Sequence, residues 1–118
     1  MLDNELNSNI KSQMRKGMLE YCILLVLKTG RQYTSGIIDS LRRAGLIVVE
    51  GTLYTLLNRL RKEGKLSYEW EESRQGPPRK YYKLTPLGLE TINLMSDAWD
   101  ETAATVSSLR RNIEEKGN

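Results

Sequence analysis

Apolar residues recur at the spacing of an amphipathic helix in several stretches of the chain, and three of these come early. The first predicted helix spans about 10–28 and ends at a glycine, Gly30. The second begins at Thr34-Ser35, residue types that cap helices, and ends before Gly45. The third spans about 51–63. Their apolar faces are formed by Ile10, Met14, Met18, Tyr21 or Cys22, and Leu25; by Ile37, Ile38 and Leu41; and by Leu53, Leu56, Leu57 and Leu60.

A strand pattern follows the third helix. In LSYEW, residues 66–70, apolar and polar side chains alternate, which is typical of a half-buried strand. The run RKYYKL at 79–84 has the same character. The segment between them contains Pro77 and Pro78 and cannot continue a ladder, because proline has no backbone donor. The pattern predicts a β-hairpin over 66–84 with a basic, proline-stiffened tip.

The last predicted helix is long and spans about 86–115. It starts at Thr85-Pro86, a capping residue followed by a proline at the first helical position. Its apolar residues step by three and four and form a narrow seam of about three heptads. The seam consists of Ile92, Met95, Trp99, Thr102, Val106, Leu109 and Ile113. So narrow a seam favours a partner helix from a second copy of the chain; the alternative is packing on the chain's own first helix.

Composition limits the chemistry that the chain can perform. The 118 residues include no His and one Cys, Cys22. This excludes an internal disulfide, a zinc site built from His and Cys, and catalysis with His as the base. We expect no metal, no cofactor and no catalytic residue. The longest apolar run, 21–27, is too short to span a bilayer, and the N-terminal segment lacks a signal-peptide pattern. We therefore expect a cytoplasmic protein without a membrane partner.

Charge is distributed unevenly along the chain. Residues 1–85 carry 15 Lys and Arg against 9 Asp and Glu, whereas residues 86–118 carry 3 against 6. Such asymmetry suggests a polyanionic partner for one face of the protein. On charge alone, however, an ordinary solvated surface that happens to be basic is the favoured interpretation.

The order of the predicted elements indicates a fold class. Three short helices followed by a two-stranded hairpin predict a mostly α protein with a winged helix-turn-helix, completed by a long C-terminal dimerisation helix. We expect residues 10–85 to form the DNA-binding domain and residues 86–116 to form the dimerisation helix, within one compact unit. In this fold, helix 51–63 would enter the major groove of double-stranded DNA.

Candidate DNA contacts lie on that helix and on the hairpin. An asparagine can pair with adenine, arginine and lysine with guanine or phosphates, and hydroxyl groups with phosphates. On the helix the candidates are Thr52, Tyr54, Thr55, Asn58, Arg59 and Lys62, with Arg61 beside them. On the wing, 72–80, the candidates for the minor groove are Arg74, Arg79 and Lys80. Tyr81 and Tyr82 are expected to pack rather than to stack on bases. The alternative for both elements is a solvated polar surface.

Three stretches of the chain resemble PadR-type transcriptional regulators of the short form, which has one C-terminal helix. They are RKGMLEYCILLVL at 15–27, EGTLYTLLNRLRKEGKL at 50–66 and WEESRQGPPRKYYKLTPLG at 70–88, in the order of the family. The resemblance implies a homodimeric winged-helix repressor, with Tyr54 near backbone phosphates and the first helix assisting the dimer. One departure is Ser35, which stands where the family often has a tyrosine before Gly36.

Trp99 is a candidate effector contact. It lies in the middle of the seam, and Met14, Met18 and Met95 could line the same dimer centre. A drug-binding branch of the family stacks planar aromatic ligands on a tryptophan at a similar place, so the resemblance implies a small hydrophobic or aromatic effector. The alternative is that Trp99 fills the dimer core.

These observations predict a repressor that reads a palindromic operator, with half-sites about one helical turn apart. The rival hypothesis is a winged-helix module that binds a protein and no DNA. A small enzyme is a remote third hypothesis, because the chain has no recognisable pair of nucleophile and base.

Overall fold

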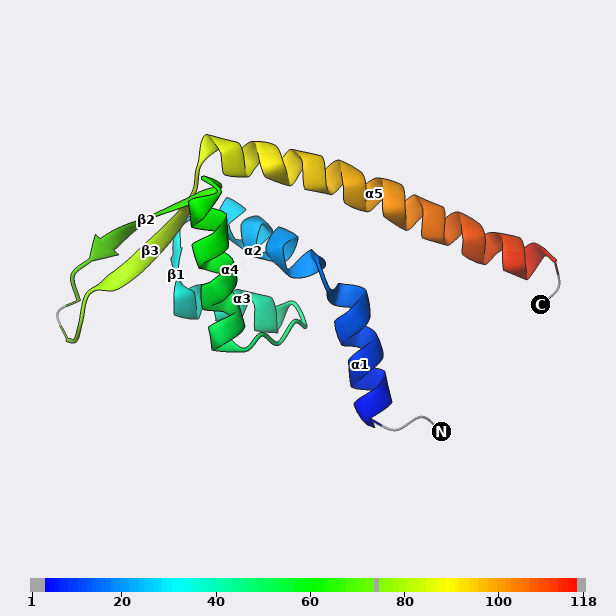
Figure 1. Cartoon of the computed structure of the whole chain (residues 1–118), viewed down its shortest axis with the longest axis horizontal. Coiled ribbons are helices and arrows are strands. Elements are labelled where there is room, and N and C mark those ends of the chain that lie inside the picture. The colour runs from blue at the N-terminus through cyan, green and yellow to red at the C-terminus, as the bar shows by residue number, and fades with distance from the viewer. Residues whose placement is uncertain (1–3, 74, 117–118) are drawn as a thin grey trace.

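The computed structural model describes residues 4–73 and 75–116, which form a mostly helical protein with a small antiparallel sheet (Figure 1). This confirms the predicted fold class. The elements are α1 (Asn4–Arg15), α2 (Met18–Lys28), β1 (Gln32–Tyr33), α3 (Thr34–Arg43), α4 (Glu50–Lys62), β2 (Leu66–Glu71), β3 (Arg79–Leu84) and α5 (Pro86–Glu115).

The first predicted helix is divided in two, so the expectation of one helix over 10–28 is wrong. The break lies at Gly17, whose φ of 89° is left-handed. Glycine adopts this conformation without steric cost, and it ends the path of a right-handed helix. In Figure 1, α1 projects from the body, and none of its residues is buried. Ile10 and Met14 therefore lie on an exposed arm rather than on the helix that enters the core.

The sheet contains a third strand that the sequence pattern did not predict. β1 pairs with β3, with Gln32 opposite Tyr82 and Tyr33 opposite Tyr81, and the strand order is β1-β3-β2. Two residues are too few to show an alternating pattern. Tyr33 also occupies the cap position of α3, without a side-chain hydrogen bond, so capping by Thr34 or Ser35 was wrongly predicted.

One apolar core joins the helices to the hairpin. Its buried residues are Ile23, Leu24 and Leu27 of α2, Ile37 and Leu41 of α3, Leu53, Leu57 and Leu60 of α4, Leu66 of β2, Tyr82 of β3 and Ile92 of α5. Each of these six elements contributes one to three of these side chains, whereas α1 and β1 contribute none. Because interiors are close-packed, this shared core fixes the position of the hairpin relative to α4.

The start of α5 is locked against the turn after α4. Thr85 caps the helix as predicted: its hydroxyl oxygen accepts a hydrogen bond from the Gly88 N–H at 3.0 Å. The same hydroxyl donates to the carbonyl oxygen of Gly64 at 2.6 Å. Gly88 is buried, and its backbone lies so close to Lys65 that a Cβ would stand 2.2 Å from the Lys65 carbonyl oxygen. The glycine is therefore required for this close approach.

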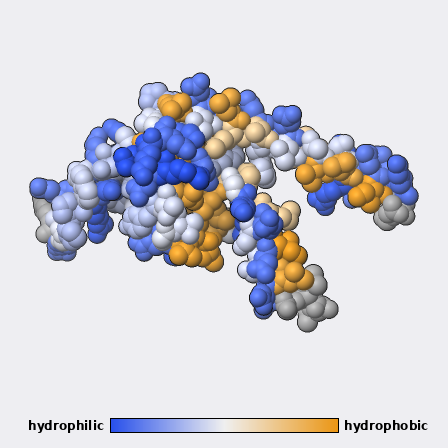
Figure 2. Space-filling view, in the orientation of Figure 1, coloured by the Kyte–Doolittle hydropathy of each residue, from blue (hydrophilic) through white to orange (hydrophobic). Residues whose placement is uncertain are grey.

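Beyond its first turns, α5 extends away from the body in a molecule of 63 × 35 × 21 Å (Figure 1). Ile92 is buried and Met95 packs against the core, so the beginning of the predicted seam serves the chain's own packing. The later seam residues Trp99, Val106, Leu109 and Ile113 are 47–59% exposed. Figure 2 shows apolar side chains gathered on α1 and near the C-terminal end of α5. None of the described helices is both long and apolar enough to cross a membrane.

We predict that Gly88→Ala lowers the free energy of unfolding by about 2 kcal/mol or more, because the new methyl group collides with backbone rather than with a flexible side chain. Urea unfolding followed by circular dichroism measures the loss. The matched control is Gly51→Ala in the first turn of α4, where a Cβ meets open space. It should leave stability unchanged or raise it by up to about 1 kcal/mol. Equal stabilities of the two variants would contradict the close contact.

Candidate nucleic-acid interface

The outer face of α4 carries the polar residues predicted for it. Thr55, Asn58 and Lys62 are exposed on the side opposite the buried leucines. Thr52 is exposed in the first turn, and Tyr54 is 43% exposed on the flank that faces the hairpin. The Thr55 hydroxyl donates to the carbonyl oxygen of Gly51 at 3.0 Å, so its oxygen remains able to accept. One helix thus presents amide, hydroxyl and ammonium groups on a single open surface.

Arg59 lies on the other flank of α4 and is ion-paired. Its guanidinium contacts the carboxylate of Glu20 on α2, whose side chain is only 15% exposed. The Lys65 ammonium is 3.3 Å from the same carboxylate and 3.0 Å from that of Glu63. The hydrogen bond that Lys65 donates to Glu63, and then the one that it donates to Glu20, raise the pKa of Lys65. Arg59 therefore serves the docking of α4 on α2, although its side chain remains 53% exposed.

Arg79 and Lys80 of the wing point in different directions. Arg79 and Lys80 are the first residues of β3, so their side chains leave opposite faces of the strand. Arg79 is exposed, with its guanidinium carbon 5.3 Å from the centre of the Tyr33 ring. The Lys80 ammonium lies over two rings, 4.5 Å from the centre of Tyr68 and 5.3 Å from that of Trp70. The third candidate, Arg74, lies outside the described residues.

The tyrosines of β3 hold the hairpin to the body. Tyr82 is 2% exposed in the core, and this burial raises the pKa of its hydroxyl. Tyr81 packs on Tyr33 with ring centres 4.1 Å apart. Both tyrosines are packing residues, as expected.

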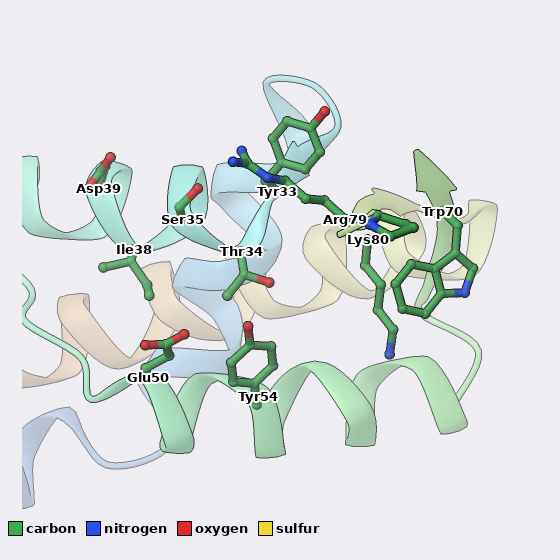
Figure 3. A pocket seen from close by; sticks show the side chains of 11 residues that line it. Tyr33, Thr34, Ser35, Ile38, Asp39, Glu50, Tyr54, Trp70, Arg79 and Lys80 are labelled. Carbon is green, nitrogen blue, oxygen red and sulfur yellow. The ribbon is translucent and has the colours of Figure 1, made fainter. Parts of the chain in front are cut away.

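A hollow of about 590 Å³ separates α4 from the hairpin (Figure 3). Glu50 and Tyr54 of α4 lie along one side, and Tyr54 points toward Thr34 at the start of α3. From the hairpin, Lys80 reaches toward α4, and Trp70 lies beside it. Ser35 and Asp39 of α3, Tyr33, Ile38, Pro78 and Arg79 complete the lining. Of the candidate residues, Tyr54 of α4 and Arg79 and Lys80 of the wing therefore border one open space, whereas Asn58 and Lys62 lie on α4 outside it.

Sequence reasoning did not select Trp70 for this surface. The alternation of Leu66, Tyr68 and Trp70 suggested a half-buried strand, yet Trp70 is 61% exposed. The three side chains share a face, but β2 extends past the body, so the core covers only its beginning. The usable signal was the position of Trp70 near the end of the strand, opposite Lys80.

The candidate effector residues come from three helices. Met14 of α1 is 77% exposed, and Met18 begins α2. Met95 and Trp99 lie one helical turn apart on α5, where Trp99 is 47% exposed. A hydrogen bond of 2.7 Å between the Tyr21 hydroxyl and Ser96 Oγ joins α2 to α5 beside them.

Three packed helices, α2, α3 and α4, followed by the hairpin β2–β3, define a winged helix-turn-helix protein. Comparison with known families agrees, because the model of the "Transcriptional regulator PadR-like family" matches residues 23–94. The chain belongs to this family, whose members are transcriptional regulators and not enzymes.

Solved structures of related proteins share the fold. A PadR-like transcription factor from Bacteroides fragilis is 57% identical, with a TM-score of 0.74, over 86% of this chain and 98% of the other. A PadR family transcriptional regulator from Eggerthella lenta is 30% identical, with a TM-score of 0.79, over 90% and 93%. Bacillus subtilis PadR, solved in complex with operator DNA, is 22% identical, with a TM-score of 0.60, over 64% of this chain and 45% of that protein.

The ion pairs of Lys65 predict a pH dependence of stability. Because folding raises the pKa of Lys65 above its ordinary value of 10.5, the contribution to stability is fully present below about pH 10.5. It is lost as the pH rises through the higher pKa of the folded state. We expect Lys65→Met to be less stable than the unsubstituted chain at pH 7, and the difference to shrink toward pH 11.

Urea unfolding across this pH range measures the difference. The control is the same pair of chains with Glu20→Gln and Glu63→Gln, in which the loss of stability caused by Lys65→Met should no longer shrink toward pH 11. A difference that persists unchanged at pH 11 would show that the ion pairs do not stabilise the fold.

Proposed function

We propose that the protein is a dimeric, DNA-binding repressor that reads a palindromic operator. The observation that carries the proposal is the common border of α4 and the wing on one hollow, so that a single duplex can contact both. In this arrangement α4 enters the major groove, and the wing lies in or near the adjacent minor groove. The operator complex of Bacillus subtilis PadR, which shares the fold, supports DNA as the partner.

The exposed groups of α4 contact different parts of the DNA, some of them base edges and others phosphates. Asn58 can form two hydrogen bonds with an adenine, and Lys62 can reach a guanine edge or a phosphate. Thr52, Tyr54 and Thr55 contact phosphates beside the groove. Arg59 keeps its pairing with Glu20 and offers its remaining donors to the same strand. Much of the affinity comes from phosphate contacts and therefore falls as salt rises.

A second copy of the chain covers the apolar side chains that a single chain leaves exposed. Trp99, Val106 and Leu109 are about half exposed along α5, and α1 exposes Met14. A two-fold pairing of α5 with its copy, assisted by α1, covers these side chains. The same symmetry presents two α4 helices to half-sites about one helical turn apart.

A small aromatic effector completes the proposal. Trp99 and its symmetry mate stack a planar ligand at the dimer centre, near Met95, Met18 and Met14. Binding there changes the angle between the two winged units and releases the operator, which is a coupling between distinct sites.

Selection of bound sequences from random duplex DNA, followed by salt titration of the enriched duplex, tests the proposed function. We expect a palindrome whose affinity falls steeply with salt. Asn58→Ala should weaken binding about 10- to 100-fold and relax the preference at one base position. Lys62→Ala should weaken binding to all sequences and reduce the salt slope by about 1.

The matched control is Arg110→Ala, which removes an exposed cation far along α5 and should leave affinity unchanged. A folded protein that enriches no sequence, or an Asn58→Ala variant with unaltered preference, would count against reading by α4.

Charge introduced into the apolar seam tests the dimer. Val106→Asp together with Leu109→Asp should convert the dimer to a folded monomer, because both side chains are exposed within one chain and face the proposed partner. Sedimentation velocity measures the mass. Ser108→Asp, on another face of the same helical turn, should leave the dimer intact. A Val106→Asp, Leu109→Asp protein that remains dimeric would contradict the seam.

A further inference from the structure

Trp70 is a large apolar side chain that the structure leaves in water. It is 61% exposed near the end of β2, where its ring and that of Tyr68 form a T-shaped pair at a centre distance of 6.1 Å. A single exposed apolar residue is ordinary. Trp70, however, also borders two hollows: that of Figure 3, and a second one lined by Glu72, Pro77 and Pro78.

Trp70 and Lys80 form one unit of the wing. They stand directly opposite each other in the antiparallel register, so their side chains leave the same face of the hairpin. The Lys80 ammonium lies 4.5 Å from the centre of Tyr68 and 5.3 Å from that of Trp70. The negative faces of these rings attract the Lys80 ammonium group and restrict its movement. The side chain therefore loses less conformational entropy when it binds an anion.

We propose that Trp70 is a further DNA-contacting residue of the wing, whose indole packs on the deoxyribose next to a phosphate bound by Lys80. The inference rests on the proposed function and adds an apolar contact to it. A sugar–phosphate strand alternates an apolar C–H surface with a negative charge, and a ring beside an ammonium group matches this alternation.

The surroundings of the pair favour a DNA strand over other occupants. The face that carries Trp70 and Lys80 borders the same hollow as Tyr54 of α4, so a strand leaving the major groove continues onto it (Figure 3). Two carboxylates, Asp39 and Glu50, line the opposite side near α3 and the start of α4. Their charge repels phosphate, and the strand therefore runs along the hairpin side of the hollow.

Fluorescence gives a direct test, because Trp70 and Trp99 are the two tryptophans of the chain. In a Trp99→Phe protein, all tryptophan emission comes from Trp70. We expect a short mixed-sequence duplex at low salt to quench this emission in parallel with binding, measured by the anisotropy of labelled DNA. In the reciprocal Trp70→Phe protein, the same duplex should leave emission nearly unchanged. Binding without a change in Trp70 emission would overturn the inference.

Salt dependence distinguishes an apolar contact from a phosphate contact. Trp70→Ala should weaken binding roughly 10-fold, the scale for loss of one buried aromatic contact, with the slope of log affinity against log salt unchanged. Lys80→Met should weaken binding and reduce the slope by about 0.9. Trp70→Phe, which keeps a ring, should retain most of the affinity.

The remaining outcomes are also decisive. Unchanged affinity in Trp70→Ala, with a normal unfolding transition, would refute the contact. A reduced slope in Trp70→Ala would show that the indole only positions Lys80. If Trp70 emission responds to dilution of the dimer but not to DNA, the occupant is a second copy of the chain. Failure of the unsubstituted protein to bind any duplex would refute the proposed function itself, which is a distinct result.

Discussion

The burial of a few apolar side chains around α2 is the constraint on which the rest of the structure depends. None of the helices of the body is long enough to be stable alone, so each gains its stability from packing in this shared core. Within the described part of the chain, no polar or charged residue is buried, and no buried side-chain polar atom lacks a hydrogen-bond partner. Polar contacts that position α4 lie instead at the edge of the core, where the Glu20 carboxylate forms ion pairs with Arg59 and Lys65.

The junction between the winged unit and α5 is as closely defined as the core. Thr85 bonds to Gly64 on one side and to Gly88 on the other, and Gly88 contacts the Lys65 backbone. Lys65 in turn pairs with Glu20, which also holds Arg59. The start of the long helix and the flank of α4 are therefore connected through adjacent contacts. Under the proposed function, a change in the angle of α5 is transmitted through these contacts to the flank of α4, beside the surface that binds DNA.

The spacing of apolar residues correctly predicted the amphipathic helices whose ends are marked by a capping residue, a proline or a glycine. α5 has the bounds expected from Thr85-Pro86, and α4 differs from its prediction by one residue at each end. The break at Gly17 was missed because apolar spacing continues across it, while a left-handed glycine leaves that spacing unchanged. β1 was not predicted because it forms by pairing with β3, a strand that is distant in the sequence. The candidate site was predicted as a set of residues. The opposite directions of Arg79 and Lys80 follow from the start of β3 at Arg79, whereas the exposure of Trp70 depends on where the hairpin leaves the body.

The outer and inner faces of α4 are independent of each other. Leu53, Leu57 and Leu60 are fully buried, whereas Thr55, Asn58 and Lys62 take no part in the core. Exposed substitutions away from special features change stability little, so mutations at these outer positions are nearly free of a folding penalty. Under the proposed function, a duplicated gene could therefore acquire a new operator by a few changes on one surface of one helix. Divergence of regulatory targets would not have to wait for compensating mutations elsewhere in the protein.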